Sequence, residues 1–248
     1  MALLEVGGLT VRFGGKVAVD GVDIAIEEGQ LVGLIGPNGA GKTTTIDAVT
    51  GFVPCTGSIR FAGTTFSDAA KRRPLPPTKR ARLGLARTWQ GADLFSDLTV
   101  LENLRVAGET SSVPALRQLL EDLDVGAFAD ESVSMLSHGQ RKLVGVGRAL
   151  AGRPKLICMD EPAAGLDTKE SQHLGARIRN ITTDGTAVLL VDHDMGLVLS
   201  ICDYLYVLDF GVMIAQGTPA EIRADERVIE AYLGRRHRDE QQSMEAPS

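Results

Sequence analysis

The sequence of 248 residues predicts an α/β fold in which helices cover a mostly parallel β-sheet. In its second half, short apolar runs alternate with segments of helical periodicity. Residues 31–35 form an apolar run that leads into a glycine-rich loop at residues 36–43. A second apolar run, residues 156–159, ends on the acidic pair Asp160 and Glu161. Both ends are expected at the carboxyl edge of the sheet, where ligands of such folds bind.

The first predicted elements form an antiparallel β part. Apolar alternation indicates strands at residues 3–13 and 17–26, separated by the turn Gly14-Gly15. The run at residues 31–35 is typical of a strand buried on both faces. A helix is expected to follow the glycine-rich loop at residues 43–50, which places the positive end of its dipole against a bound anion.

The middle of the chain predicts a surface loop and a small helical lobe. Residues 67–82 hold six Lys or Arg residues and three Pro residues, and we expect a solvated loop there. A nucleic-acid contact is the alternative, but the aromatic residues that usually accompany one are missing. Residues 98–136 are mostly helical in pattern, and the inserted lobe is expected to span about 91–150.

The remaining elements restore the alternation of helix and strand. Helices are predicted at residues 141–151 and 168–183, and strands at 58–61, 156–159, 187–191, 204–208 and 212–216. One domain is expected over residues 1–235. The polar tail 236–248 has no periodicity and is expected to be disordered.

Composition narrows the classes of function. The net charge of −6 argues against a general nucleic-acid binder. Cys55, Cys158 and Cys202 are odd in number and widely spaced, which suits a reducing compartment and indicates neither a disulfide nor a metal site. The apolar runs fall far below the roughly 18 residues of a membrane-spanning helix, so service to a membrane is expected to require a partner.

The glycine-rich loop has the sequence GPNGAGKT and fits the phosphate-loop pattern G-x-x-x-x-G-K-[ST]. In this pattern backbone N–H groups surround phosphates, Lys42 reaches the β and γ oxygens, and the Thr43 hydroxyl binds Mg²⁺. The residues expected to bind nucleotide here are Gly36, Asn38, Gly39, Ala40, Gly41, Lys42, Thr43 and Thr44.

The acidic pair predicts the metal and catalytic groups. Asp160 is placed to hold Mg²⁺ through its water shell. Glu161 is placed to act as a base, or to polarise a water molecule, at the γ-phosphate.

Three further features complete an ordered set. Gln90 follows Arg87-Thr88-Trp89, the string LSHGQ occupies residues 136–140, and His193 follows a predicted strand. In LSHGQ, Ser137 can cap a helix and Gly139 permits close approach of a ligand. Together with the phosphate loop and the acidic pair, these features resemble the nucleotide-binding subunits of ABC transporters. LSHGQ is similar to the signature LSGGQ of that family, with His138 in place of the first glycine.

The resemblance implies a phosphate-loop ATPase core and a role for each matching residue. Gln90 would contact Mg²⁺ and the attacking water, His193 the γ-phosphate, and Phe13 the adenine ring. By residue type alone, Phe13 also suits core packing and His193 a structural position. The residues that the resemblance places across a subunit interface are Ser137, His138, Gly139, Gln140 and Asp167.

The resemblance extends to the ATPase subunits of branched-chain (hydrophobic) amino-acid importers. It rests on GLARTWQ at residues 84–90, VDHDM at 191–195, GTP at 217–219 and AYLG at 231–234. The sequence departs from the pattern of this branch at two places. The stretch at 104–133 is shorter than usual, and Trp89 replaces the usual phenylalanine.

This resemblance implies hydrolysis of ATP with Mg²⁺ by a homodimer, or by a heterodimer with a paralogous ATPase subunit. The dimer would bind integral membrane permease subunits at the cytoplasmic face of the membrane, and through them would serve a solute-binding protein. A lipid or lipopolysaccharide exporter remains the alternative. A non-transport ABC ATPase of DNA repair or translation is a third hypothesis, but the tandem cassettes or the long coiled coil of such proteins are missing from the sequence.

Overall fold

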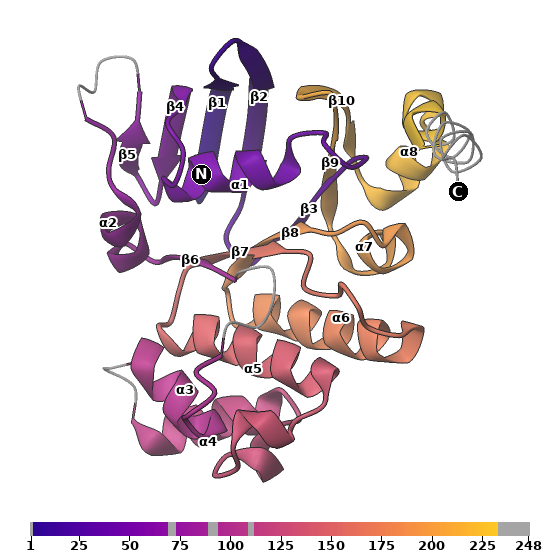
Figure 1. The fold of residues 1–248 in the computed structure, drawn as a ribbon. Coiled ribbons are helices and arrows are strands. Elements are labelled where there is room, and N and C mark those ends of the chain that lie inside the picture. Colours follow the sequence, from indigo (N-terminus) through magenta and orange to yellow (C-terminus); the bar gives the residue numbers. More distant parts are fainter. Residues whose placement is uncertain (1, 69–72, 89–93, 109–111, 233–248) are drawn as a thin grey trace, which may run out of the picture.

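The computed structural model describes residues 2–68, 73–88, 94–108 and 112–232. Within these ranges the chain forms two β-sheets, with helices packed between them and below the larger one (Figure 1). No helix of the described residues has the length and apolar character needed to cross a membrane. The predicted tail, residues 236–248, lies outside the described residues.

The smaller sheet is the antiparallel β part that the sequence predicts. Its strand order is β2-β1-β4-β5, and every pair is antiparallel. In β1 the buried residues Leu4, Val6, Leu9 and Val11 are interspersed with more exposed residues, as expected for a strand with one face on the core. The strands are β1 (Leu4–Phe13), β2 (Lys16–Ile26), β4 (Thr56–Phe61) and β5 (Thr64–Ser67).

The larger sheet has the order β10-β9-β3-β8-β7-β6, and only its β9–β10 pair is antiparallel. Every residue of β3, β7 and β8 is buried, which agrees with their continuous apolar sequences. Because these strands are parallel, the segments that follow β3 and β7 emerge at the same edge. The strands are β3 (Leu31–Ile35), β6 (Leu85–Arg87), β7 (Leu156–Asp160), β8 (Ala187–Val191), β9 (Tyr204–Asp209) and β10 (Val212–Gly217).

Two hydrophobic cores lie on opposite faces of this larger sheet. Along β8, Leu189 and Val191 join the core shared with the antiparallel sheet and helix α1 (Lys42–Thr50). The alternate residues Val188 and Leu190 join the core formed with the other helices. The period of two along a strand therefore divides β8 between the two cores.

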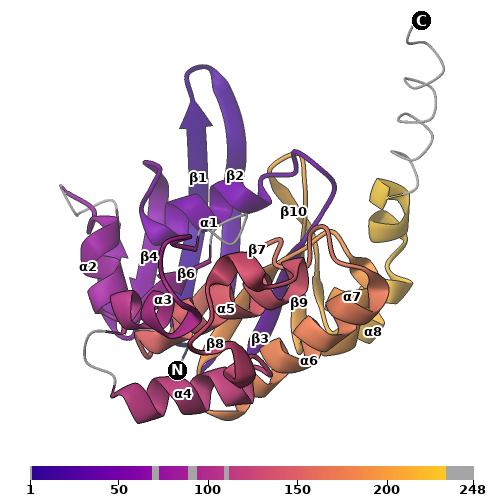
Figure 2. The same ribbon diagram turned by 60° about the horizontal axis from the view of Figure 1, so that its bottom comes forward.

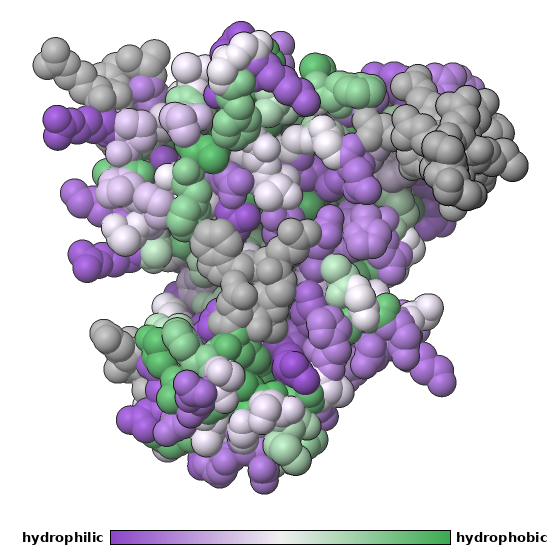
Figure 3. All heavy atoms as spheres, viewed as in Figure 1, coloured by the Kyte–Doolittle hydropathy of each residue, from purple (hydrophilic) through white to green (hydrophobic). Residues whose placement is uncertain are grey.

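The second core is covered by a helical layer. Helices α3, α4 and α5 pack together, and Figure 2 shows them beside α6. Apolar surface gathers over this layer near α3 (Figure 3), where Val106 is exposed. The helices are α3 (Val100–Ala107), α4 (Val113–Asp122), α5 (His138–Ala151), α6 (Thr168–Thr183), α7 (Met195–Ile201) and α8 (Pro219–Ala224).

The expectation of a fully solvated loop at residues 67–82 is wrong for Arg80. This residue lies in helix α2 (Pro77–Arg82) and is only 2% exposed. Its guanidinium donates hydrogen bonds to the carbonyl oxygens of Ala48 at 2.8 Å, Val49 at 2.6 Å and Leu75 at 2.8 Å. The last carbonyl groups of a helix lack partners within it, and Arg80 supplies them for α1. The charge run in the sequence therefore contains a structural cation, Arg80.

Replacing Arg80 with alanine is expected to lower the free energy of unfolding by about 2–4 kcal/mol, because backbone carbonyl groups lose a charged donor inside the protein. The midpoint of thermal unfolding should fall by about 5–15 °C for a chain of this size. Lys79→Ala, at an exposed position of the same helix, is the control. Equal midpoints for the two variants would contradict the structural role of Arg80.

Candidate functional site

The glycine-rich loop fits its surroundings only with glycine at two of its positions. Gly36 has φ of +150°, and a Cβ atom there would lie 2.1 Å from the carbonyl oxygen of Leu208. Gly41 has φ of +102°, and a Cβ atom there would lie 2.7 Å from the carbonyl oxygen of Ala18. The loop is thus held between β2 and the β9–β10 turn, with no room for side chains at these points.

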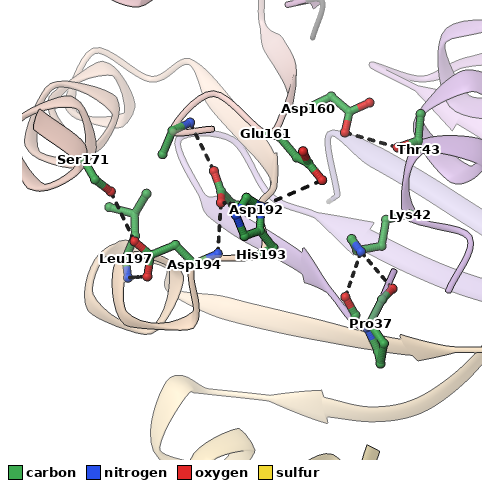
Figure 4. A network of polar contacts seen from close by, with 12 residues as sticks. Pro37, Lys42, Thr43, Asp160, Glu161, Ser171, Asp192, His193, Asp194 and Leu197 are labelled. Carbon is green, nitrogen blue, oxygen red and sulfur yellow. Dashed lines mark hydrogen bonds and ion pairs between the residues drawn. The ribbon is translucent and has the colours of Figure 1, made fainter. Parts of the chain in front are cut away.

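Lys42 is buried under this loop and oriented by it. Its ammonium donates hydrogen bonds to the carbonyl oxygens of Gly36 at 2.7 Å and Pro37 at 3.0 Å (Figure 4). The helix that starts here, α1, has Gly41 as its N-cap and no side-chain cap. Its first N–H groups and the lysine therefore present positive charge at one place, which is the requirement for binding phosphate.

Thr43 and Asp160 bring two oxygen donors together at the edge of the sheet. The Thr43 hydroxyl donates to Oδ1 of Asp160 at 3.3 Å, although the two residues are far apart in the sequence. Asp160 is only 2% exposed. Burial raises the pKa of its carboxyl group, whereas the nearby Arg87 and Thr43 lower it.

These two donors fit Mg²⁺ that arrives with a nucleotide. Mg²⁺ prefers oxygen ligands and is usually bound by one or two protein groups, with water and phosphate completing its shell. Within the part of the chain that the structure describes, no cluster of three or more His, Cys, Asp or Glu side chains could hold a metal by itself. The oxygen atoms of Thr43 and Asp160 fit this mode of binding, in which phosphate and water supply the other ligands.

Glu161 has an unusual backbone conformation for its residue type. It follows the buried strand β7 with φ of +48°, a left-handed conformation that costs a non-glycine residue about 1–2 kcal/mol. Its N–H donates to the carbonyl oxygen of Val191 at 2.7 Å, which fixes the turn. Strain of this kind often lies at functional sites, and the turn directs the carboxylate toward His193 (Figure 4).

His193 completes this group at the end of the neighbouring strand. Its Nδ1 atom lies 3.9 Å from Oε1 of Glu161 and 3.7 Å from Oδ1 of Asp192, and its ring is exposed. The structure thus places four predicted residues, Thr43, Asp160, Glu161 and His193, along one edge of the sheet. Gln90, the remaining predicted catalytic residue, lies outside the described residues.

Asp192 is part of this site but was not singled out from the sequence. It is only 1% exposed and accepts hydrogen bonds from the N–H groups of Ala163 at 3.2 Å and Asp194 at 3.0 Å. It therefore links the segment after β7 to the segment after β8. Its position directly after an apolar run is the same signal that identified Asp160.

Lys142 is a second residue near the acidic site that the sequence did not indicate. It lies in α5 and is buried. Burial lowers the pKa of its ammonium, and the negative charges of Asp192 and Glu161 raise it. Lys142 therefore connects the signature helix electrostatically to the acidic site on its own chain.

The signature residues form the predicted helix start. The Ser137 hydroxyl accepts from the N–H of Gln140 at 3.2 Å, and Oε1 of Gln140 accepts from the N–H of Ser137 at 2.8 Å. This reciprocal pair caps α5. A Cβ atom at Gly139 would lie 3.0 Å from Oε1 of Glu170, so a larger residue there would press on α6.

His138 and Asp167 lie where the start of α5 approaches the segment before α6. Nε2 of His138 lies 3.4 Å from the carbonyl oxygen of Ala164. Asp167 caps α6 by accepting from the N–H groups of Lys169 at 2.8 Å and Glu170 at 2.9 Å. Asp167 therefore stabilises the start of α6 within its own chain, independently of any contact with a second chain.

The signature helix and the phosphate-loop helix cover opposite faces of the larger sheet. Apolar residues of α1 pack in the core shared with the antiparallel sheet, and those of α5 pack in the core below (Figure 1). Phe13, at the end of β1, is 52% exposed, so its ring is not used in core packing.

Comparisons with known proteins agree with this geometry. The chain matches a family model described as ABC transporter over residues 19–164, and a model described as branched-chain amino acid ATP-binding cassette transporter over residues 212–238. It is 41% identical to the high-affinity branched-chain amino acid transport ATP-binding protein BraF of Pseudomonas aeruginosa, over 94% of this chain and 98% of the relative. With the same coverage of both chains, it is 37% identical to LivG of Escherichia coli, which has the same description.

The chain is also similar to an export-system ATP-binding protein and to solved ATP-binding cassettes. The lipopolysaccharide export system ATP-binding protein LptB of Escherichia coli is 36% identical, over 94% of this chain and 98% of the relative. Among solved structures, the ADP conformation of an ATP-binding cassette of an ABC transporter superposes with a TM-score of 0.84 at 31% identity. That match covers 94% of this chain and 99% of the other, and it confirms the predicted fold class.

Proposed function

The chain belongs to the ABC transporter family, and we propose that it is the ATP-hydrolysing subunit of an importer for branched-chain amino acids or related small polar solutes. ABC ATPases bind nucleotide and couple its hydrolysis to transport. The observation that carries the assignment of the site is the meeting of Lys42 and Thr43 with Asp160 and Glu161 at one edge of the sheet.

In the proposed reaction, the first N–H groups of α1 and the Lys42 ammonium bind the β- and γ-phosphates of ATP. The other nucleotide contacts come from the phosphate loop, and Phe13 stacks on the adenine ring. Thr43, Asp160 and Gln90 would hold Mg²⁺, which neutralises charge on the phosphates.

Water attacks the γ-phosphorus, the bond to the ADP oxygen breaks, and Glu161 accepts the proton from water. His193 lies beside Glu161 and is proposed to donate a hydrogen bond to the γ-phosphate. The strained turn at Glu161 supports the role of Glu161 as the base, because the turn fixes its carboxylate beside the phosphate loop.

We propose that two chains bind ATP between them, as a homodimer or with a paralogous ATPase subunit. The phosphate-loop helix and the signature helix cover opposite faces of one sheet, which supports a head-to-tail pair related by a two-fold axis. Each nucleotide would then lie between the loop of one chain and the signature of the other. The residues proposed to act across the interface are Ser137, His138, Gly139, Gln140 and Asp167.

The membrane partners are proposed to be permease subunits at the cytoplasmic face, which in turn receive solute from a binding protein. The domain would span residues 1–235, with its helical lobe at about 91–150 meeting the permease. Phe95 and Val106 expose apolar side chains on this lobe. Apolar surface also gathers over the helical layer in Figure 3, which suits a protein contact.

Import is favoured over export by two of the similarities. Identity to the branched-chain amino acid protein BraF exceeds identity to LptB, and the C-terminal segment matches a branched-chain amino acid family model. The similarity to LptB keeps a lipopolysaccharide-type exporter as the second candidate.

Replacing Glu161 with glutamine is expected to leave ATP binding nearly unchanged and to lower turnover about 10²-fold or more, because the base is lost while its shape is kept. Lys42→Ala should instead weaken ATP binding itself. Release of phosphate and binding of a fluorescent ATP analogue measure the two effects. Wild-type turnover in Glu161→Gln would show that another group accepts the proton.

The direction of transport is tested with cells that carry the chain at its natural level. The tagged chain should co-purify with two permease subunits, and deletion of its gene should abolish uptake of radiolabelled leucine. Wild-type protein should restore uptake, and Glu161→Gln should not. Unchanged leucine uptake after deletion, with loss of lipopolysaccharide export, would favour the second candidate.

A further inference from the structure

Arg87 occupies a fixed position beside the acidic site. It ends β6 and pairs in register with Cys158 of the neighbouring strand β7, two residues before Asp160. The next residue, Thr88, donates its N–H to the carbonyl oxygen of Cys158 at 2.9 Å. The pairing of β6 with β7 therefore fixes the backbone at Arg87, and the side chain of Arg87 is only 8% exposed.

The guanidinium of Arg87 connects two carboxylates from different elements. Its Nη1 atom pairs with Oδ1 of Asp47 in α1, and its Nη2 atom lies 3.3 Å from Oδ2 of Asp160. The Cζ atom of Arg87 lies 5.9 Å from the centroid of the Phe52 ring. A planar guanidinium can hold two carboxylates in a fixed relation, which the point charge of a lysine cannot do.

The two oxygen atoms of Asp160 consequently have different partners. Oδ2 faces Arg87, and Oδ1 faces the hydroxyl of Thr43 at 3.3 Å. A buried carboxylate with one oxygen held in this way has its other oxygen directed at the start of α1. That oxygen is the one beside the proposed metal and phosphate.

We propose that Arg87 is a positioning residue for ATP hydrolysis, which fixes Asp160 so that its Oδ1 atom serves Mg²⁺ and which ties α1 to the same carboxylate through Asp47. This inference rests on the proposed function. It assigns to Arg87 a role that is exerted through its contacts with Asp160 and Asp47.

Two effects of Arg87 on Mg²⁺ have opposite signs, and this makes the proposal testable. As a nearby cation, Arg87 repels Mg²⁺, so its loss would strengthen metal binding if charge alone mattered. As a positioning group, it orients Asp160, so its loss should weaken metal binding. The proposal states that orientation outweighs repulsion.

The test compares ATP binding in EDTA and in Mg²⁺ for purified full-length Arg87→Met, which keeps the length of the side chain without its charge. In EDTA its affinity for a fluorescent ATP analogue should stay within about threefold of wild type, since Lys42 and the phosphate loop are unchanged. The Mg²⁺ concentration that half-saturates binding and turnover should rise about tenfold. Arg82→Met, at an exposed position of α2, is the matched control and should behave as wild type.

Two further variants separate positioning from folding. Asp47→Asn keeps the contact of Arg87 with Asp160 and should shift the Mg²⁺ requirement less than Arg87→Met does. Arg87→Lys should lie between wild type and Arg87→Met, and it serves as the test if Arg87→Met does not fold. A purely structural role would lower the unfolding midpoint without changing the Mg²⁺ requirement, and would overturn the proposal.

Tighter Mg²⁺ binding in Arg87→Met, or an unchanged Mg²⁺ requirement, would also overturn it. Asp160→Asn distinguishes these results from failure of the proposed function. If Asp160→Asn raises the Mg²⁺ requirement and Arg87→Met does not, only the inference on Arg87 fails. If neither variant changes the requirement, the metal assignment itself is wrong.

Discussion

The hydrogen bond between Thr43 and Asp160 joins two segments that are 117 residues apart, and the rest of the site depends on this contact. It exists because β3 and β7 are parallel and are separated only by β8, so that both strands end at one edge of the sheet. The phosphate loop follows β3, and the acidic pair follows β7. A register shift in either pair would separate the groups proposed to bind phosphate from the carboxylates.

The sequence predicted the features that depend on local pattern. Continuous apolar runs identified the buried strands, and the loop and acidic pair lie where their positions after β3 and β7 required. It did not reveal that the side chains of Arg80 and Arg87 are largely buried, because each is stabilised by carbonyl or carboxylate groups distant in the chain. Short elements such as β6 and α7 were also missed, since a few residues carry too little periodicity.

Contacts between segments that are distant in the sequence account for the polar residues that only the structure reveals. Asp192 connects the segments after β7 and β8, and Lys142 brings a cation from the signature helix to the same acidic group. Arg87 adds a second cation from β6. The buried carboxylates thus face cations from separate elements, which offsets the cost of removing their charge from water.

The central proposal is that each chain contributes its phosphate loop to one ATP site and its signature residues to another. It rests on the observation that the phosphate-loop helix and the signature helix cover opposite faces of one sheet. The direct measurement is the mass in solution, by light scattering, of Glu161→Gln saturated with ATP and Mg²⁺. The account predicts about twice the chain mass of 26.4 kDa, a return to the monomer mass with ADP, and a monomer for Lys42→Ala with ATP. An ATP-saturated Glu161→Gln that stays monomeric, alone and mixed with a paralogous ATPase subunit, would contradict it.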